Sequence, residues 1–182
     1  LYGSVDSGSN WTNITSKVSG TGITWNGATL SGSSNILFKT TDAAGNDSSS
    51  PGSQAYVFDT TAPSVNSFTV SDTALKAGDT ATVTLVFSEA VASFSSAADI
   101  TVANGTLAAM ISADNITWAG TFTPTANTED DNNTLSLATS YTDTAENAGP
   151  AATTANYAVE TLAPSVNSFT LSDTALKAGD NA

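Results

Sequence analysis

The chain carries one segment twice, and this repeat constrains its architecture more than any other feature. Residues 61–81 read TAPSVNSFTVSDTALKAGDTA and residues 162–182 read LAPSVNSFTLSDTALKAGDNA, which is a shift of 101 residues. The same shift aligns TDAAGN at 41–46 with TDTAEN at 142–147 without a gap. A fixed period of this length is the size of one small domain, whereas solenoid repeats are shorter. The sequence therefore predicts a tandem array of separate domains.

The period divides the chain into three parts. Residues 1–61 are predicted to be the C-terminal half of one domain, residues 62–161 a complete domain, and residues 162–182 the start of a third repeat, a lone strand plus a turn. A half domain leaves the apolar face of one sheet uncovered, so the first part should not fold alone. Its missing strands are expected from a longer chain or from another chain. Pro63 and Pro164 follow short linkers and restrict the backbone there.

The charge balance excludes several classes of partner. Four lysines and no arginine, histidine or cysteine stand against 17 acidic residues, for a formal net charge of −13. Binding to nucleic acid or to an anionic membrane surface requires a basic surface, so both are excluded. A disulfide framework is impossible without cysteine. No apolar run approaches transmembrane length, so we expect no membrane insertion in this segment.

Alternating hydrophobicity predicts strands throughout the complete domain. The segment 80–88, TATVTLVFS, puts Ala81, Val83, Leu85 and Phe87 on one face, which is the period-2 pattern of a half-buried strand. Further strands are predicted at 116–122, 133–139 and 156–160 and around Phe68, with inward side chains at Phe68, Val70, Ile116, Trp118, Phe122, Leu135, Leu137, Tyr157 and Val159.

Segment 99–112 contains Asn104-Gly105, which predicts a hairpin between two short strands. Seven strands in roughly 100 residues, with no helix-length pattern, indicate an all-β, immunoglobulin-like antiparallel sandwich. In the first part, 22–30, 35–40 and 54–59 are the predicted strands of the same plan, with Ile23 and Trp25 on one face of the first. The fold class is therefore tandem immunoglobulin-like sandwiches joined by short proline-containing linkers.

Several stretches make the chain resemble a known family. SDTALKAGDTATVTLVFSEAV, DITVANGTLA, FTPTA and YTDTAENAG, followed by LAPS, resemble the bacterial Ig-like repeats of giant surface adhesins and biofilm-associated proteins. SNWTNI, TDAAGN and VFDTTAPS resemble a sister type of the same repeats. The resemblance covers essentially the whole chain. It implies an extracellular array on the bacterial cell surface, of the RTX type exported by type I secretion, in which calcium stiffens the domain junctions. Glu146 stands where the family usually has glycine, as at Gly45, and is expected to reshape the second loop.

The acidic residues gather at the predicted ends of the domains. In an antiparallel sandwich each strand takes the chain from one end of the domain to the other. Loops that are far apart in sequence therefore meet at the same end. One end is predicted to bring together Asp59, Glu89, Asp143 and Asn147, and the other end Glu129, Asp130, Asp131 and Glu160. Asp42 and Asn46 are placed at the corresponding end of the first part.

Such clusters predict calcium. Carboxylates a few ångströms apart repel without a cation, and Ca²⁺ takes six to eight oxygen ligands with tolerant geometry. Zinc and copper are disfavoured because the chain has no histidine or cysteine. The alternative is that these residues are solubilising surface charge with side-chain turns. That alternative suits any single residue, whereas calcium suits the set at the junctions.

Other residues have structural explanations first. Trp118 and Trp25 alternate in phase with apolar neighbours and are predicted in the core, while Trp11 breaks that phase and is a weak candidate for a carbohydrate contact. No catalytic triad or phosphate-binding loop is present, and adjacent loop acids such as Asp130 and Asp131 do not suit a glycosidase, so no enzyme is predicted.

Three functions compete. The first is a structural extender segment of a bacterial surface adhesin, whose partners are the neighbouring Ig-like repeats. The second is a module that binds a glycan, a host protein or ice, which predicts an exposed aromatic or flat apolar patch. The third is an accessory Ig-like domain of a secreted enzyme, which predicts a catalytic domain elsewhere in a longer parent protein. The near-identical segments favour the first, because spacers multiply by duplication.

Overall fold

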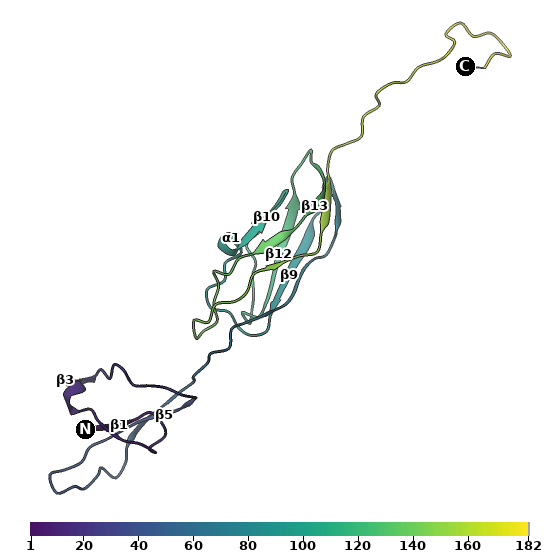
Figure 1. Ribbon diagram of the computed structural model, residues 1–182. Coiled ribbons are helices and arrows are strands. Elements are labelled where there is room, and N and C mark those ends of the chain that lie inside the picture. Colours follow the sequence, from purple (N-terminus) through teal and green to yellow (C-terminus); the bar gives the residue numbers. More distant parts are fainter. Residues whose placement is uncertain (182) are drawn as a thin grey trace. The chain divides into compact units, whose positions relative to one another are not determined.

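A computed structural model describes residues 1–181, and the chain separates into two compact units (Figure 1). The first unit holds Leu1–Ala62 and Ala145–Asn147, and the second holds Pro63–Thr144 and the residues from Ala148 on. Strands dominate both units. Within the described residues, helices are limited to the 3-10 turn η1 (Thr15–Lys17) and the single turn α1 (Ser96–Asp99). The all-β prediction is confirmed.

The second unit is built on a four-stranded antiparallel sheet. Its order is β11-β12-β9-β7, with β11 at Gly105–Leu107, β12 at Thr117–Pro124, β9 at Ala81–Phe87 and β7 at Val65–Val70. Two three-stranded sheets complete the unit: β10 (Ile100–Val102), β14 (Leu135–Leu137) and β15 (Ala152–Thr153) form one, and β13 (Glu129–Asn133), β16 (Tyr157–Glu160) and β8 (Ala74–Lys76) form the other. Side chains from these three sheets meet in a single core.

The strand β9 forms the centre of that core. Val83, Leu85 and Phe87 are fully buried, while Thr84 and Val86 between them are half-buried, as the alternating pattern predicts. The predicted inward residues Phe122, Leu135, Leu137, Tyr157 and Val159 are also at most 2% exposed. Removing each such side chain from water contributes roughly 1.5–3 kcal/mol, so these positions dominate the stability of the unit.

The first difference from the predicted sandwich is a parallel strand pair. Residues 74–76 form a separate strand, β8, which lies parallel to β16 with Ala74 opposite Ala158 and Lys76 opposite Glu160. The chain between β7 and β8 therefore moves from one sheet to another, which buries Leu75 completely. With β13 and β15 also added, the described residues of this unit form ten strands, β7 to β16, rather than seven.

The predicted hairpin at Asn104-Gly105 is wrong. β10 pairs with β14 and β11 pairs with β12, so the chain crosses between sheets at this turn instead of folding back on itself. The Asn104 side chain donates to the carboxylate of Asp130 at 2.8 Å and to the side-chain oxygen of Asn133 at 2.7 Å. Gly105 lies against the ring of Phe122, where a Cβ atom would come within 2.2 Å. These tertiary contacts override the local preference of Asn-Gly for a hairpin.

The first unit is built on one four-stranded sheet and has few buried hydrophobic side chains. Its order is β2-β1-β5-β6, with β2 at Thr12–Asn13, β1 at Tyr2–Ser4, β5 at Ser34–Lys39 and β6 at Gly52–Tyr56, and β3 (Val18–Ser19) pairs with β4 (Gly22–Ile23) beside it. β5 and β6 confirm the two predicted strands, but β6 ends before Val57 and Phe58, which are exposed. The expected strand at 22–30 shortens to β4. Ile14 is the one large hydrophobic residue of residues 1–62 with less than 9% exposure, so this unit has almost no buried core.

The repeated segment has different structures in its two copies. Residues 162–181 contain no strand within the described chain, so the strand predicted there is not observed. Val166 and Phe169 are 83% and 89% exposed, whereas the equivalent Val65 is half-buried and Phe68 is 7% exposed. Burial of this segment therefore depends on β9 and β16, which cover the first copy.

Candidate functional site

Glu89 and Asp143 meet at the end of the second unit where its chain enters. The Ser64 N–H donates to Ser88 Oγ at 2.8 Å, and the Ser88 N–H donates to the Ser64 carbonyl at 2.8 Å. Glu89 follows directly, and a bridge between Val91 and Asp143 brings in the second acid. Carboxylate oxygens of Glu89 and Asp143 lie within 4.8 Å of each other. This end thus holds two acids, of which Asp143 is only 1% exposed.

The aromatic residue Tyr141 fixes the loop that carries Asp143. Its ring is fully buried and its hydroxyl donates to the Pro150 carbonyl at 2.8 Å. Burial raises the pKa of Tyr141, and the charge of Asp99 adds to this shift. Gly149 packs on the ring so closely that a Cβ atom would lie 2.1 Å from it. The contacts of Tyr141 with Gly149 and Pro150 therefore fix both ends of this loop.

Asp59 and Asn147, the other residues predicted for this end, belong to the first unit. Asp59 Oδ1 accepts the N–H of Thr61 at 2.9 Å. Asn147 Nδ2 donates to the carbonyls of Asp59 and Thr61 at 3.3 and 3.4 Å. The Asn147 amide thus contacts the segment that leads into Pro63, and its role as a metal ligand stays a prediction.

The second predicted cluster lines a shallow cavity within the second unit. Glu129, Asp130, Asp131 and Glu160 surround a volume of about 290 Å³. The predicted loop at 129–132 is in fact part of strand β13, and Glu129 lies directly opposite Glu160 of β16. The antiparallel pairing of β13 and β16 therefore brings these acids together at a sheet edge rather than in a loop.

Asp130 differs from its three neighbours because its carboxylate is already engaged. It accepts hydrogen bonds from Asn104 Nδ2 at 2.8 Å and from the Asn132 N–H at 2.9 Å. Burial, and to a lesser extent the charge of Asp130, raises the pKa of Tyr157 to about 12. Asp130 therefore holds the turn at Asn104, and the exposed acids Glu129, Asp131 and Glu160 are the ones open to solvent.

Asp42 and Asn46 form a closed turn in the first unit. Asp42 Oδ1 accepts the N–H groups of Ala44 and Asn46 at 2.9 and 2.8 Å, and Asp42 Oδ2 accepts from Asn46 Nδ2 at 3.0 Å. These bonds, of which the one from the Asn46 side chain has the largest effect, hold the pKa of Asp42 below its usual value. This geometry fits the alternative of a side-chain turn, because the carboxylate already has three donors.

The equivalent loop one period later keeps the same conformation. Glu146 has φ 68° where Gly45 has φ 90°. Bridges between Thr41 and Asp47 and between Thr142 and Ala148 close the two loops at equivalent positions. The glutamate therefore does not reshape the loop; it adopts the left-handed conformation, which disfavours residues with a Cβ atom.

Asp99 is an important acid that the sequence patterns did not reveal. It is 4% exposed, accepts the Ser95 N–H at 2.7 Å and accepts a short hydrogen bond from the Ser140 hydroxyl. The bond to Ser95 closes the single turn of α1, and the bond to Ser140 ties that turn to the segment before Tyr141. A serine four residues before an aspartate was the available signal, and it is too common to be diagnostic.

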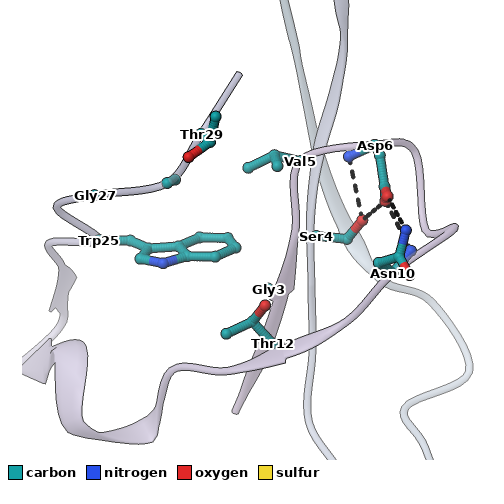
Figure 2. A pocket seen from close by; sticks show the side chains of 10 residues that line it. Gly3, Ser4, Val5, Asp6, Asn10, Thr12, Trp25, Gly27 and Thr29 are labelled. Carbon is teal, nitrogen blue, oxygen red and sulfur yellow. Dashed lines mark hydrogen bonds between the residues drawn. The ribbon is translucent and has the colours of Figure 1, made fainter. Parts of the chain in front are cut away.

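The first unit contains a second cavity, of about 210 Å³, beside Trp25. Figure 2 shows the indole ring between the segment with Gly27 and Thr29 and the strands with Gly3 and Thr12. The ring packs on Gly3, where a Cβ atom would lie 2.5 Å from it. Trp25 is half-buried and lines this cavity, so its predicted core position is only partly realised.

A hydrogen-bonded cluster forms the polar end of this cavity (Figure 2). Ser4 Oγ donates to the Asp6 carboxylate at 2.6 Å. The backbone and side-chain N–H groups of Asn10 donate to the same carboxylate at 2.9 and 2.6 Å. These bonds, of which the one from Ser4 has the largest effect, lower the pKa of Asp6 to about 2. Nearby, Lys39 Nζ lies 4.5 Å from the centre of the Trp11 ring, which gives that half-buried tryptophan a cation–π contact.

The chain belongs to the bacterial Ig-like domain family. The model of that family matches residues 59–159, which is just over half of the sequence and covers the second unit from its linker to β16. The family defines a non-catalytic type of fold that is usually found in extracellular or surface proteins. No curated protein and no solved structure matches the chain. Among residues 1–181, no helix is long and apolar enough to span a membrane.

Proposed function

We propose that this chain is a structural extender segment of a bacterial cell-surface adhesin, and that Ca²⁺ at the domain ends stiffens successive Ig-like repeats. Its role is mechanical and not enzymatic: it holds an adhesive tip away from the cell, and its partners are neighbouring repeats of the same chain. Membership of a family of surface Ig-like modules supports this role. The near-identity of residues 61–81 and 162–182 supports a repeated spacer.

The observation that carries the proposal is the approach of Glu89 to Asp143. Their carboxylate oxygens lie within 4.8 Å of each other, and Asp143 is almost fully buried. Two like charges about 4 Å apart repel by about 4 kcal/mol at an effective dielectric constant of about 20. A divalent cation replaces this repulsion with attraction, and hard carboxylate oxygens are the ligands that calcium prefers.

The sequence predicts further ligands at the same end. Ser64 is fixed beside Ser88, next to Glu89, by two hydrogen bonds, one to the Ser88 side chain and one from the Ser88 backbone N–H. Because a chain spans at most about 3.6 Å per residue, Asp59 is tethered within about 18 Å of Ser64. Asp59 and Asn147, whose amide donates to the Asp59 carbonyl, stay predicted ligands.

The other end of the second unit offers a weaker site. Glu129, Asp131 and Glu160 are exposed around the cavity of about 290 Å³, and Asp130 already accepts protein hydrogen bonds. Exposed acids lose less solvation on binding but are also less pre-organised, so we expect weaker affinity here than at Glu89 and Asp143.

Calorimetry with two matched double variants tests the proposal. The full chain is heated in Ca²⁺, in Mg²⁺ and in chelator, and Ca²⁺ is expected to raise Tm. Binding to the folded state alone adds about 2.7 kcal/mol of stability at 100 times Kd. Glu89→Gln with Asp143→Asn removes two charges at one end, and Glu129→Gln with Glu160→Gln removes two at the other. The first pair should abolish most of the calcium effect, and the second pair should leave most of it.

Two results would contradict the calcium proposal. An unchanged Tm of the unmodified chain in Ca²⁺ would show that the acids are surface charges only. An equal loss of the calcium effect in both double variants would show that it arises from general charge screening. Small-angle scattering of the same samples tests the mechanical part, because a stiffened array should have a larger maximum dimension in Ca²⁺ than in chelator.

The cavity at Trp25 favours a second function, the binding of a sugar ring. A tryptophan face accepts the apolar C–H face of a pyranose, and Asn10 and Asp6 offer polar groups at one end (Figure 2). Titration with a panel of monosaccharides should quench or shift the tryptophan fluorescence, and Trp25→Ala should remove the response while Trp118→Phe keeps it. No response to any sugar in the panel would exclude this second function.

A further inference from the structure

The chain contains two Asn-Gly pairs, at 26–27 and at 104–105. Such pairs undergo an uncatalysed reaction when the backbone is free to bend. The glycine amide nitrogen attacks the Asn Cγ atom and forms a new C–N bond, and the side-chain nitrogen leaves as ammonia with the proton from the glycine amide. Water then opens the resulting succinimide at one of its two carbonyls, which gives aspartate or isoaspartate. The only co-reactant is water.

Asn26 lies in an environment that permits this reaction. Asn26 and Gly27 form an exposed turn, and Gly27 has φ 83°. Apart from Gly27 and its two chain neighbours, no residue has an atom within 4 Å of the position that a Cβ of Gly27 would occupy. The Asn26 side chain makes no hydrogen bond within the described residues. The amide nitrogen of Gly27 can therefore approach the side chain, and water has free access.

Asn104 has the same chemistry but is held in place. Its side-chain nitrogen donates to Asp130 Oδ2 at 2.8 Å and to Asn133 Oδ1 at 2.7 Å. Its carbonyl accepts the Thr125 N–H at 2.9 Å. Gly105 is covered by the ring of Phe122. The leaving nitrogen is thus bonded on two sides, and the backbone cannot bend without breaking the core.

We infer that Asn26 is a site of spontaneous deamidation and that the fold protects Asn104 from it. The reaction converts an amide to a carboxylate between Trp25 and Gly27, two residues that line the cavity of the first unit. It therefore adds one negative charge at the rim of that cavity. This inference concerns the first unit and does not rest on calcium binding.

Timed incubation followed by proteolysis and mass spectrometry tests the inference. Cleavage after Lys17 and Lys39 releases residues 18–39, whose mass rises by the difference between an amide and an acid when Asn26 reacts. At mildly alkaline pH, the folded chain should convert Asn26 at least about tenfold faster than Asn104, which corresponds to a barrier difference of about 1.4 kcal/mol. In concentrated urea the two rates should become similar.

Two variants keep the test decisive. Gly27→Ala should slow the reaction at Asn26, and Asn26→Gln should abolish it in the same peptide. The inference is overturned if the folded chain converts both asparagines at the same rate. It is also overturned if urea leaves the ratio unchanged, because flanking residues rather than the fold would then set the difference.

Discussion

Glu129 and Glu160 lie directly opposite each other in the antiparallel pair of β13 and β16. Side chains in such a pair are neighbours on one face, and like charges there are destabilising. Glu129→Lys should therefore raise the free energy of unfolding by about 0.5–1 kcal/mol in chelator. Urea unfolding at low and high salt measures the gain, which should shrink as salt screens the pair. Glu129→Gln should give part of the gain, and a loss of stability in Glu129→Lys would contradict the pairing.

The left-handed residue Glu146 provides a second prediction. An L-residue with a Cβ atom costs roughly 1–2 kcal/mol in this conformation, whereas glycine adopts it freely. Glu146→Gly should stabilise the protein by about 1 kcal/mol, measured by thermal unfolding. The matched control is Glu146→Ala, which removes the charge and keeps the strain, so it should change stability by less than about 0.5 kcal/mol. Equal effects of both changes would assign the gain to charge.

Trp118 is expected to tolerate one substitution and not another. Its ring packs edge-on against Phe94 with centroids 4.9 Å apart, but its buried Nε1 atom has no hydrogen-bond partner. Trp118→Ala should cost about 3 kcal/mol, since it removes a large aromatic side chain from the edge of the core. Trp118→Phe keeps most of the packing and removes the unpaired N–H, so its cost should stay below about 1 kcal/mol. Denaturant unfolding that ranks the two variants in the opposite order would contradict this account.

The first unit should lose stability in acid because of Asp6. Its pKa is lowered from 3.8 to about 2 in the folded chain, so its stabilising effect is complete above pH 3.8 and is lost as the pH falls through about 2. Fluorescence of Trp11 and Trp25, in a Trp118→Phe background, should report unfolding of this unit across that window. Asp6→Asn should flatten the response, whereas Asp131→Asn should leave it unchanged. The same acid transition in Asp6→Asn would assign it to other groups.

The core was predictable from the sequence because each strand carries its own signal. In β9, alternation alone identified Val83, Leu85 and Phe87 as buried, and the structure confirms it. Strands of the edge sheets carry no such signal. β13 reads EDDNN, which no hydrophobic pattern predicts, and it exists because β16 offers a partner with Val159 at its centre.

The direction of each strand decides which loops share an end of the domain, and this part of the candidate site was predictable from the sequence. Counting strands placed Glu89 and Asp143 at one end, and their carboxylates do meet there. The same count could not show that Asp130 binds Asn104, because that bond depends on the crossing between sheets. Nor could it show Asp99, whose partner Ser140 is distant in sequence and whose burial comes from the tertiary packing of α1.

The turn between Asp72 and Asp79 forms in both copies of the repeated segment. The Lys76 N–H donates to Asp79 at 3.1 Å, and the equivalent Lys177 N–H donates to Asp180 at 3.0 Å, although only the first copy is covered by a sheet. The turn is therefore encoded by its own residues and needs no partner strand. In an array of near-identical repeats, strands risk pairing with the wrong neighbour during synthesis. A turn that closes as soon as it leaves the ribosome sets where its strand ends before any sheet exists, and so helps each repeat to assemble with itself.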